Sequence, residues 1–149
     1  MPMTPAMAVV GHRRLLDALE ELARALVAGL DADACAISRA VGDALLFVCQ
    51  AATDGRNLAL GQGYLASEYP ETQAVLDLRE PRTACLGCPG GDESEERLLE
   101  ELGYAALLML PLELNGEVWG LVEVYREEPR PFGAVEIRAA SLLLAQLGQ

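Results

Sequence analysis

The stretch YAALLMLPLELNGEVWGLVEVYRE, from Tyr104 to Glu127, contains the strongest folding signal in this chain. Two apolar runs flank Asn115-Gly116, and Asn-Gly between apolar runs is typical of a two-residue β-hairpin turn. The first run is apolar at alternate and intervening positions alike, which predicts a strand covered on both faces. Pro111 has no N–H to donate to a ladder, so it indicates an edge or a bulge. The stretch therefore predicts an antiparallel hairpin within a covered sheet.

A second hairpin is expected upstream, where two shorter apolar runs flank Gly42-Asp43. A two-residue turn there sets Ala36 opposite Cys49 and points Cys35 and Cys49 to opposite faces of the sheet. We therefore expect these two cysteines not to pair, and interpret both as small core residues.

Helices are expected at both ends of the chain, over residues 11–30 and 132–147. Leucines recur at helical spacing in the first segment. The second segment is apolar around most of its girth, which predicts burial on more than one side. One side can face the sheet, and the other would pack on the first helix or on its copy in a second subunit.

The segment between the hairpins is irregular. It predicts a short helix from about Pro70 to before Pro81, a short strand in PRTAC, and an acidic, solvated helix that Ser94 caps and Gly103 ends. The whole order predicts an α+β fold, in which the terminal helices cover one face of a central antiparallel sheet and the irregular excursion covers the other. Residues 1–10 are expected to be a flexible N-terminus, and residues 11–149 a single domain.

The net charge of the chain limits the classes of partner that it can be expected to bind. It has 23 acidic residues against 11 basic ones, all arginine, for a net charge of −12. Such a chain repels phosphate backbones and anionic lipid surfaces, so nucleic acid and membrane are excluded as expected partners. The N-terminus does not have the charge order of a secretory signal, which predicts a cytoplasmic protein with reduced thiols.

The wording LLMLPLELNGEVWGLVEVYREEPRPFGAVEIRAA, together with the element order, resembles a GAF domain. The resemblance extends over roughly residues 11–148. It implies a small-molecule sensor module of bacterial signalling proteins, with its ligand between the sheet and the excursion. It also implies a homodimer formed through the terminal helices and a signal passed to an output domain or a partner protein.

The resemblance places a ligand pocket under the excursion. The expected lining is apolar and aromatic with a few polar groups, as is usual for small-molecule sites. The candidates are Phe47, Tyr64, Tyr69, Cys85, Met109 and Glu123. The ligand or cofactor stays unidentified: the lysine of cyclic-nucleotide-binding members is missing, and the only histidine, His12, is remote from every cysteine that could attach a bilin.

Cys85 and Cys88 form a Cys-x-x-Cys pair, a spacing shared by redox dithiols and half of a zinc site. Zinc would need two further ligands, which the chain does not supply at such spacing, so no metal is expected. TAC at Cys85 also resembles the free methionine sulfoxide reductases, a branch of small GAF enzymes, so a thiol enzyme using Cys85 and Cys88 stays open. A non-catalytic sensor is the leading hypothesis, and a degenerate dimerisation unit is the third.

Overall fold

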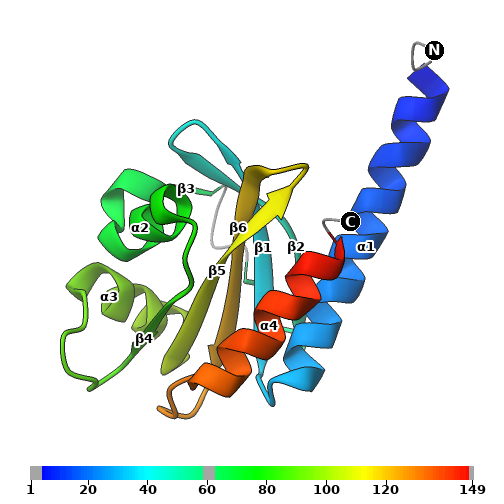
Figure 1. Cartoon of the computed structure of the whole chain (residues 1–149). Helices are drawn as coiled ribbons and strands as arrows, with labels where there is room; N and C mark the ends of the chain where they lie inside the picture. Colours follow the sequence, from blue (N-terminus) through cyan, green and yellow to red (C-terminus); the bar gives the residue numbers. More distant parts are fainter. Residues whose placement is uncertain (1–4, 59–62, 148–149) are drawn as a thin grey trace.

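A six-stranded antiparallel sheet forms the centre of the computed structural model, with the strand order β3-β2-β1-β6-β5-β4. The structure describes residues 5–58 and 63–147, those up to residue 13 by their backbone alone. Figure 1 shows two helices, α1 and α4, side by side on one face of the sheet, and two shorter ones, α2 and α3, on the other. The predicted α+β arrangement is therefore confirmed.

The elements keep the predicted order. The helices are α1 (Pro5–Gly29), α2 (Pro70–Leu78), α3 (Glu93–Leu102) and α4 (Ala134–Leu147), with a short 3-10 turn at Ala66–Glu68. The strands are β1 (Ala34–Val41), β2 (Ala44–Ala52), β3 (Tyr64–Leu65), β4 (Arg82–Cys85), β5 (Ala106–Leu114) and β6 (Glu117–Arg126). Within the described residues, no helix has both the length and the apolar character needed to cross a bilayer.

Both predicted hairpin turns are present. Asn115 and Gly116 have φ angles of 55° and 79°, so both lie in the left-handed region that a two-residue hairpin turn requires. Gly42 also has a positive φ, 60°, in the β1–β2 turn. Pro111 pairs with Leu121 of β6 and lies beyond the last residue of β5 that β4 reaches, so its missing N–H breaks no ladder.

The register of β1 on β2 differs from the expected one. The pairing shifts between Ile37 and Ser38, so that Ile37, and not Ala36, lies opposite Cys49. The extra residue in β2 is a β-bulge, and it reverses the facing of every residue beyond it. The prediction that Cys35 and Cys49 face opposite sides is therefore wrong.

Both of these thiols lie in the core beneath α1 and α4, and both are free. Burial raises the pKa of Cys35 well above its usual range and that of Cys49 to about 11. Both therefore stay protonated at neutral pH and are poor nucleophiles, as expected of core cysteines.

The sheet separates two cores. Alternate residues of β5 face opposite sides: Leu108 and Leu110 lie in the core under α1 and α4, whereas Leu107 and Met109 lie in the core under α2 and α3. The prediction that this strand is covered on both faces is therefore confirmed.

The terminal helices differ in two respects from expectation. Helix α1 begins at Pro5, so part of the segment expected to be a flexible N-terminus is helical, and residues 1–4 lie outside the described residues. Helix α4 contacts β5 and α1, but its outward side is uncovered in the single chain, with Val135 83% and Leu142 62% exposed. The predicted burial on more than one side is thus only partly met within one copy.

Candidate functional site

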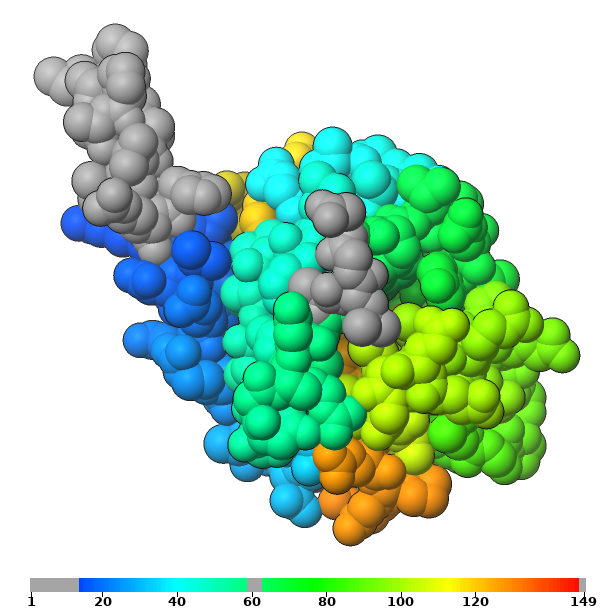
Figure 2. Space-filling model, turned by 180° about the vertical axis from the view of Figure 1, so that it is seen from behind, coloured from blue at the N-terminus to red at the C-terminus, as the bar shows by residue number. Residues whose placement is uncertain are grey.

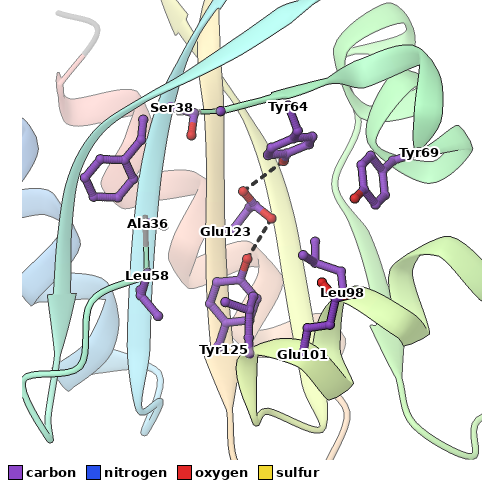
Figure 3. Close-up of a pocket in the computed structure, with 12 residues that line it drawn as sticks. Ala36, Ser38, Leu58, Tyr64, Tyr69, Leu98, Glu101, Glu123 and Tyr125 are labelled. Carbon is purple, nitrogen blue, oxygen red and sulfur yellow. Dashed lines mark hydrogen bonds between the residues drawn. The ribbon is translucent and has the colours of Figure 1, made fainter. Parts of the chain in front are cut away.

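A cavity of about 220 Å³ lies on the excursion face of the sheet, between the sheet and α3 (Figure 3). In Figure 2, the segment that follows β2 and helix α3 border each other on this side of the molecule. The described lining residues come from β1, β2, β3, β6, α3 and the flanking loops. They are Ala36, Ser38, Phe47, Leu58, Gly63, Tyr64, Tyr69, Leu98, Glu101, Leu102, Glu123 and Tyr125.

Glu123 is the polar centre of the cavity. It lies in the middle of β6 between Val122 and Val124, whose side chains pack into the opposite core, so strand alternation turns Glu123 towards the cavity. It is only 3% exposed. Tyr64 donates its hydroxyl to Oε1 at 3.0 Å and Tyr125 to Oε2 at 2.7 Å (Figure 3).

These contacts set the protonation of the cluster. Burial raises the pKa of Glu123, and the two tyrosine hydroxyls oppose that rise because they stabilise the carboxylate. Burial, followed by the negative charge of Glu123, also raises the pKa of Tyr64 and Tyr125 well above their usual range. Both tyrosines therefore keep their protons at neutral pH and can donate them to Glu123.

Two aromatic rings form a corner of the cavity. The ring centroids of Tyr64 and Tyr69 lie 5.0 Å apart with an interplanar angle of 78°, the edge-to-face arrangement that aromatic pairs prefer. Tyr64 belongs to β3, and Tyr69 precedes Pro70, which occupies the first turn of α2. The start of α2 thus fixes one wall of the cavity.

Glu95 of α3 lies close to this site and is fully buried. Its Oε1 accepts a hydrogen bond from the Thr72 hydroxyl at 2.6 Å, while Oε2 has no hydrogen-bond partner among the described residues. Burial raises its pKa to about 7, and the charges of Glu123 and Asp92 act in the same direction. The expectation that the whole acidic helix is a solvated face is therefore wrong at Glu95.

The cap of α3 also differs from the expected one. Asp92 is the N-cap, and its side chain accepts the backbone N–H of Ser94 at 3.3 Å. Ser94 was expected to be the cap and lies instead in the first turn. Gly103 ends the helix as predicted, with a φ of 82°.

The structure brings four of the six candidate lining residues together at the cavity: Phe47, Tyr64, Tyr69 and Glu123. Met109 faces the same side of the sheet but packs under α2, with its sulfur 3.4 Å from the Thr72 hydroxyl, and does not line the cavity.

Cys85 faces the other way. It pairs with Ala106, which lies in the core under α1 and α4, and Cys85 is itself buried in that core. The prediction that Cys85 lines the pocket is therefore wrong, because the strand register puts its side chain on the face of the sheet that α1 and α4 cover. Cys85 is joined to Cys88 by a disulfide, with the two Cα atoms 5.4 Å apart. All four cysteines of the chain thus lie in or against the same core, across the sheet from the cavity.

Several lining residues were missed from the sequence. Tyr125 could have been found, because it lies two positions after Glu123 on the same strand and so shares its face. Ser38 and the α3 residues Leu98 and Glu101 had no such signal, because their positions depend on how the excursion folds back over the sheet.

Comparison with known proteins agrees with this architecture. The family model described as "GAF domain" matches residues 14–149. No curated protein sequence matches the chain significantly.

Several solved structures have the same fold. A phycocyanobilin-bound GAF domain from a cyanobacterial phytochrome superposes with a TM-score of 0.77 at 18% identity, covering 94% of this chain and 87% of that chain. The PixJ GAF domain of Thermosynechococcus elongatus in its blue-light-absorbing form gives 0.74 at 21% identity, covering 91% and 86%. A GAF domain/HD domain protein from Geobacter sulfurreducens gives 0.72 at 15% identity, covering 90% and 89%.

Proposed function

The chain belongs to the GAF domain family, and from this premise we propose that it is a non-catalytic sensory domain. It binds a small molecule between the sheet and the excursion and signals through α1 and α4. The observation that carries the proposal is the cavity itself, whose apolar and aromatic walls surround one buried, doubly hydrogen-bonded carboxyl group, Glu123. Concave sites of this composition are typical of small-molecule binding.

Strand β6 supplies a route from the cavity to the terminal helices. Glu123 faces the cavity, and its neighbours Val122 and Val124 pack in the core beneath α1 and α4. A ligand that moves β6 changes the surface on which both helices rest. Signalling then requires only that the ligand bind one packing of the helices more tightly than another.

The position of the thiols favours a sensor over a thiol enzyme. The cavity contains no cysteine among its described lining residues, and all four cysteines lie across the sheet. The same geometry argues against a bilin attached through a cysteine in this cavity, although some GAF domains of the same fold hold bilins.

Native mass spectrometry tests the proposal. Protein purified without denaturation should retain a small molecule, and its return to emptied protein should slow amide hydrogen exchange in α1 and α4. Leu98→Trp, which fills the cavity, should abolish retention, whereas Leu78→Trp, at a site 56% exposed on α2, should not. Protein that is always empty, with exchange unaffected by any added extract, would favour a dimerisation unit instead.

The Cys85–Cys88 disulfide is the one observation that favours a thiol enzyme as a second candidate. Free methionine sulfoxide with a dithiol reductant is the substrate test. We expect no turnover. Turnover that disappears in Cys85→Ser would replace the sensor proposal with the enzyme one.

A further inference from the structure

The described charged side chains that line the cavity are all acidic. Its described lining includes two carboxyl groups, Glu101 and Glu123, and no basic side chain. Glu95, buried beneath α3, adds a third acid whose charge acts on Tyr64 and Tyr69.

The neighbouring arginines do not neutralise this charge. Arg56 lies outside the lining and is held by Asp54 at 2.8 Å and by Glu127 at 3.1 Å. Arg97 is not in the described cavity lining but lines an adjoining surface hollow together with Tyr69 and Glu101. A buried acid without a cationic partner is costly, and within the described residues the hydrogen-bond partners of buried Glu123 are the uncharged hydroxyls of Tyr64 and Tyr125.

The polar atoms grouped around Glu123 are hydrogen-bond acceptors, while the hydroxyls of Ser38 and Tyr69 in the same lining can donate or accept. Each oxygen of Glu123 accepts one tyrosine hydroxyl and keeps a further lone pair. The hydroxyls of Tyr64 and Tyr125 donate their protons to Glu123. Their oxygens are therefore left to accept hydrogen bonds from a ligand. A bound group that carries several N–H donors meets all of these needs together.

The aromatic walls of the cavity also favour a ligand group that carries N–H donors and a positive charge. Phe47, Tyr64, Tyr69 and Tyr125 line the cavity, and the nearly perpendicular rings of Tyr64 and Tyr69 offer two aromatic surfaces at one corner. The faces of aromatic rings attract cations, and the attraction is stronger where water is excluded. An ammonium group with an apolar body would therefore find both its charge and its hydrocarbon part accommodated.

We infer that the ligand of this cavity is a small organic cation: a protonated amine whose N–H groups contact Glu123 and whose apolar part lies against the tyrosine rings. The inference rests on the proposed sensory function and adds the chemical class of the ligand. The volume of about 220 Å³ is below the roughly 300–1,000 Å³ of drug-sized sites, so the amine is small. An anionic ligand would meet the carboxyl groups of Glu101 and Glu123 and no basic side chain among the described lining residues.

Three probes of nearly equal size and different charge test this inference: benzylamine, benzyl alcohol and benzoate. Binding is measured by NMR through the methyl signals of Leu98, which line the cavity and report even millimolar affinity. We expect benzylamine to bind at least tenfold more tightly than benzyl alcohol, and benzoate not to bind. Glu123→Gln should weaken benzylamine at least tenfold and leave benzyl alcohol within twofold.

Two further variants serve as a charge control and as a second test of the inference. Glu117→Gln, exposed on the same strand, removes an equal charge and should change nothing. Glu101→Gln, at an exposed position on the cavity rim where folding is not at risk, should weaken benzylamine two- to threefold. This variant keeps the inference testable if Glu123→Gln does not fold.

The outcomes separate the two proposals. Preference for benzoate or benzyl alcohol over benzylamine, or an equal loss in Glu117→Gln and Glu123→Gln, would overturn the cation inference and leave a small-molecule sensor standing. No change in the Leu98 signals with any of the three probes would also overturn the cation inference, and the sensor proposal would then be decided by the retention test alone.

Discussion

Glu95 is a buried carboxyl group with one oxygen bonded to Thr72 and the other without a partner among the described residues, and it makes the stability of the protein depend on pH. Its pKa is about 7 in the folded chain against about 4.5 in the unfolded one. The folded state therefore binds more protons between these values, and stability falls as pH rises through this window. At 1.36 kcal/mol per pKa unit, the full loss is about 3 kcal/mol.

Glu95→Gln should remove this dependence. The amide can still pair with Thr72 and does not ionise, so the variant should exceed the wild type in stability by up to about 3 kcal/mol at pH 8 and by much less at pH 5.5. Urea unfolding at the two pH values measures the difference. Glu100→Gln, exposed on the same helix, should stay within about 0.5 kcal/mol of the wild type at both. A constant gain for Glu95→Gln at both pH values would contradict the argument.

Arg126, at the end of β6, is a second residue whose role only the fold reveals. It is 1% exposed and donates to the carbonyl oxygens of Leu30 at 2.6 Å and Arg130 at 3.1 Å. It also pairs with Glu136 in the first turn of α4 and stacks on Phe132 at 3.9 Å from the ring centroid. One guanidinium thus joins the end of α1 to the start of α4.

Arg126→Met should cost about 3 kcal/mol of unfolding free energy, because it leaves buried carbonyl groups without donors. Arg130→Met serves as the comparison: its partner Asp31 is 93% exposed, so the loss should stay below about 1 kcal/mol. Thermal unfolding of both variants at equal ionic strength measures the contrast. Similar losses for the two would show that Arg126 contributes no more than a surface charge.

At the scale of elements, the β1–β6 pair sets how closely the two hairpins approach. Gly120 of β6 lies opposite Arg39, and a Cβ at this glycine would collide with the backbone carbonyl oxygen of Ser38. Backbone cannot withdraw as a flexible side chain can, so Gly120 is required by close approach.

Gly120→Ala should therefore destabilise the protein by about 1–3 kcal/mol, the usual cost of overpacking. Gly133→Ala is the matched control, since its Cβ would meet only a side-chain atom at 3.9 Å, and it should be nearly neutral. Chemical unfolding with a common baseline compares them. A neutral Gly120→Ala would mean that the two strands can separate at no cost.

At the scale of the whole molecule, the two terminal helices form one layer with an uncovered outward side. Val135 and Leu142 project from α4 into solvent, and the N-terminal turns of α1 extend past the sheet in Figure 1. Large apolar side chains gathered on one helix face are typical of contact surfaces.

We expect the chain to sediment as a dimer and Leu142→Glu to shift it towards monomer at least tenfold in dissociation constant. Ser141→Glu, exposed on a different face of the same helix, adds the same charge without removing an apolar group and should leave the dimer intact. Sedimentation across a range of concentrations measures both. A wild-type chain that stays monomeric at the highest concentration would contradict the expectation.

The local signals in the sequence determined the element order, both hairpin turns and the two-sided burial of β5, because turn chemistry and side-chain alternation depend only on near neighbours. They also placed Glu123 among the candidates. They did not determine which face of the sheet a side chain occupies when a bulge intervenes or when the strand pairs with one far away in the sequence. Cys49 and Cys85 were misplaced because each depends on a register that one extra residue or one partner strand resets.

The cavity belongs to the tertiary structure alone. In the sequence Glu95 is one of several acids in a charged helix. Its burial results from the packing of α3 against Thr72, which removes the Glu95 carboxyl group from water. Tyr64 lies 59 positions before Glu123 in the sequence, yet it shares one hydrogen-bonded group with Glu123 and Tyr125. The sequence by itself determined the longer helices and strands, but it did not predict β3 (Tyr64–Leu65) or the helical turns of α1 before residue 11. Only the folding of the excursion over the sheet decided which acids and rings enclose a common space, because that depends on contacts between residues far apart in the chain.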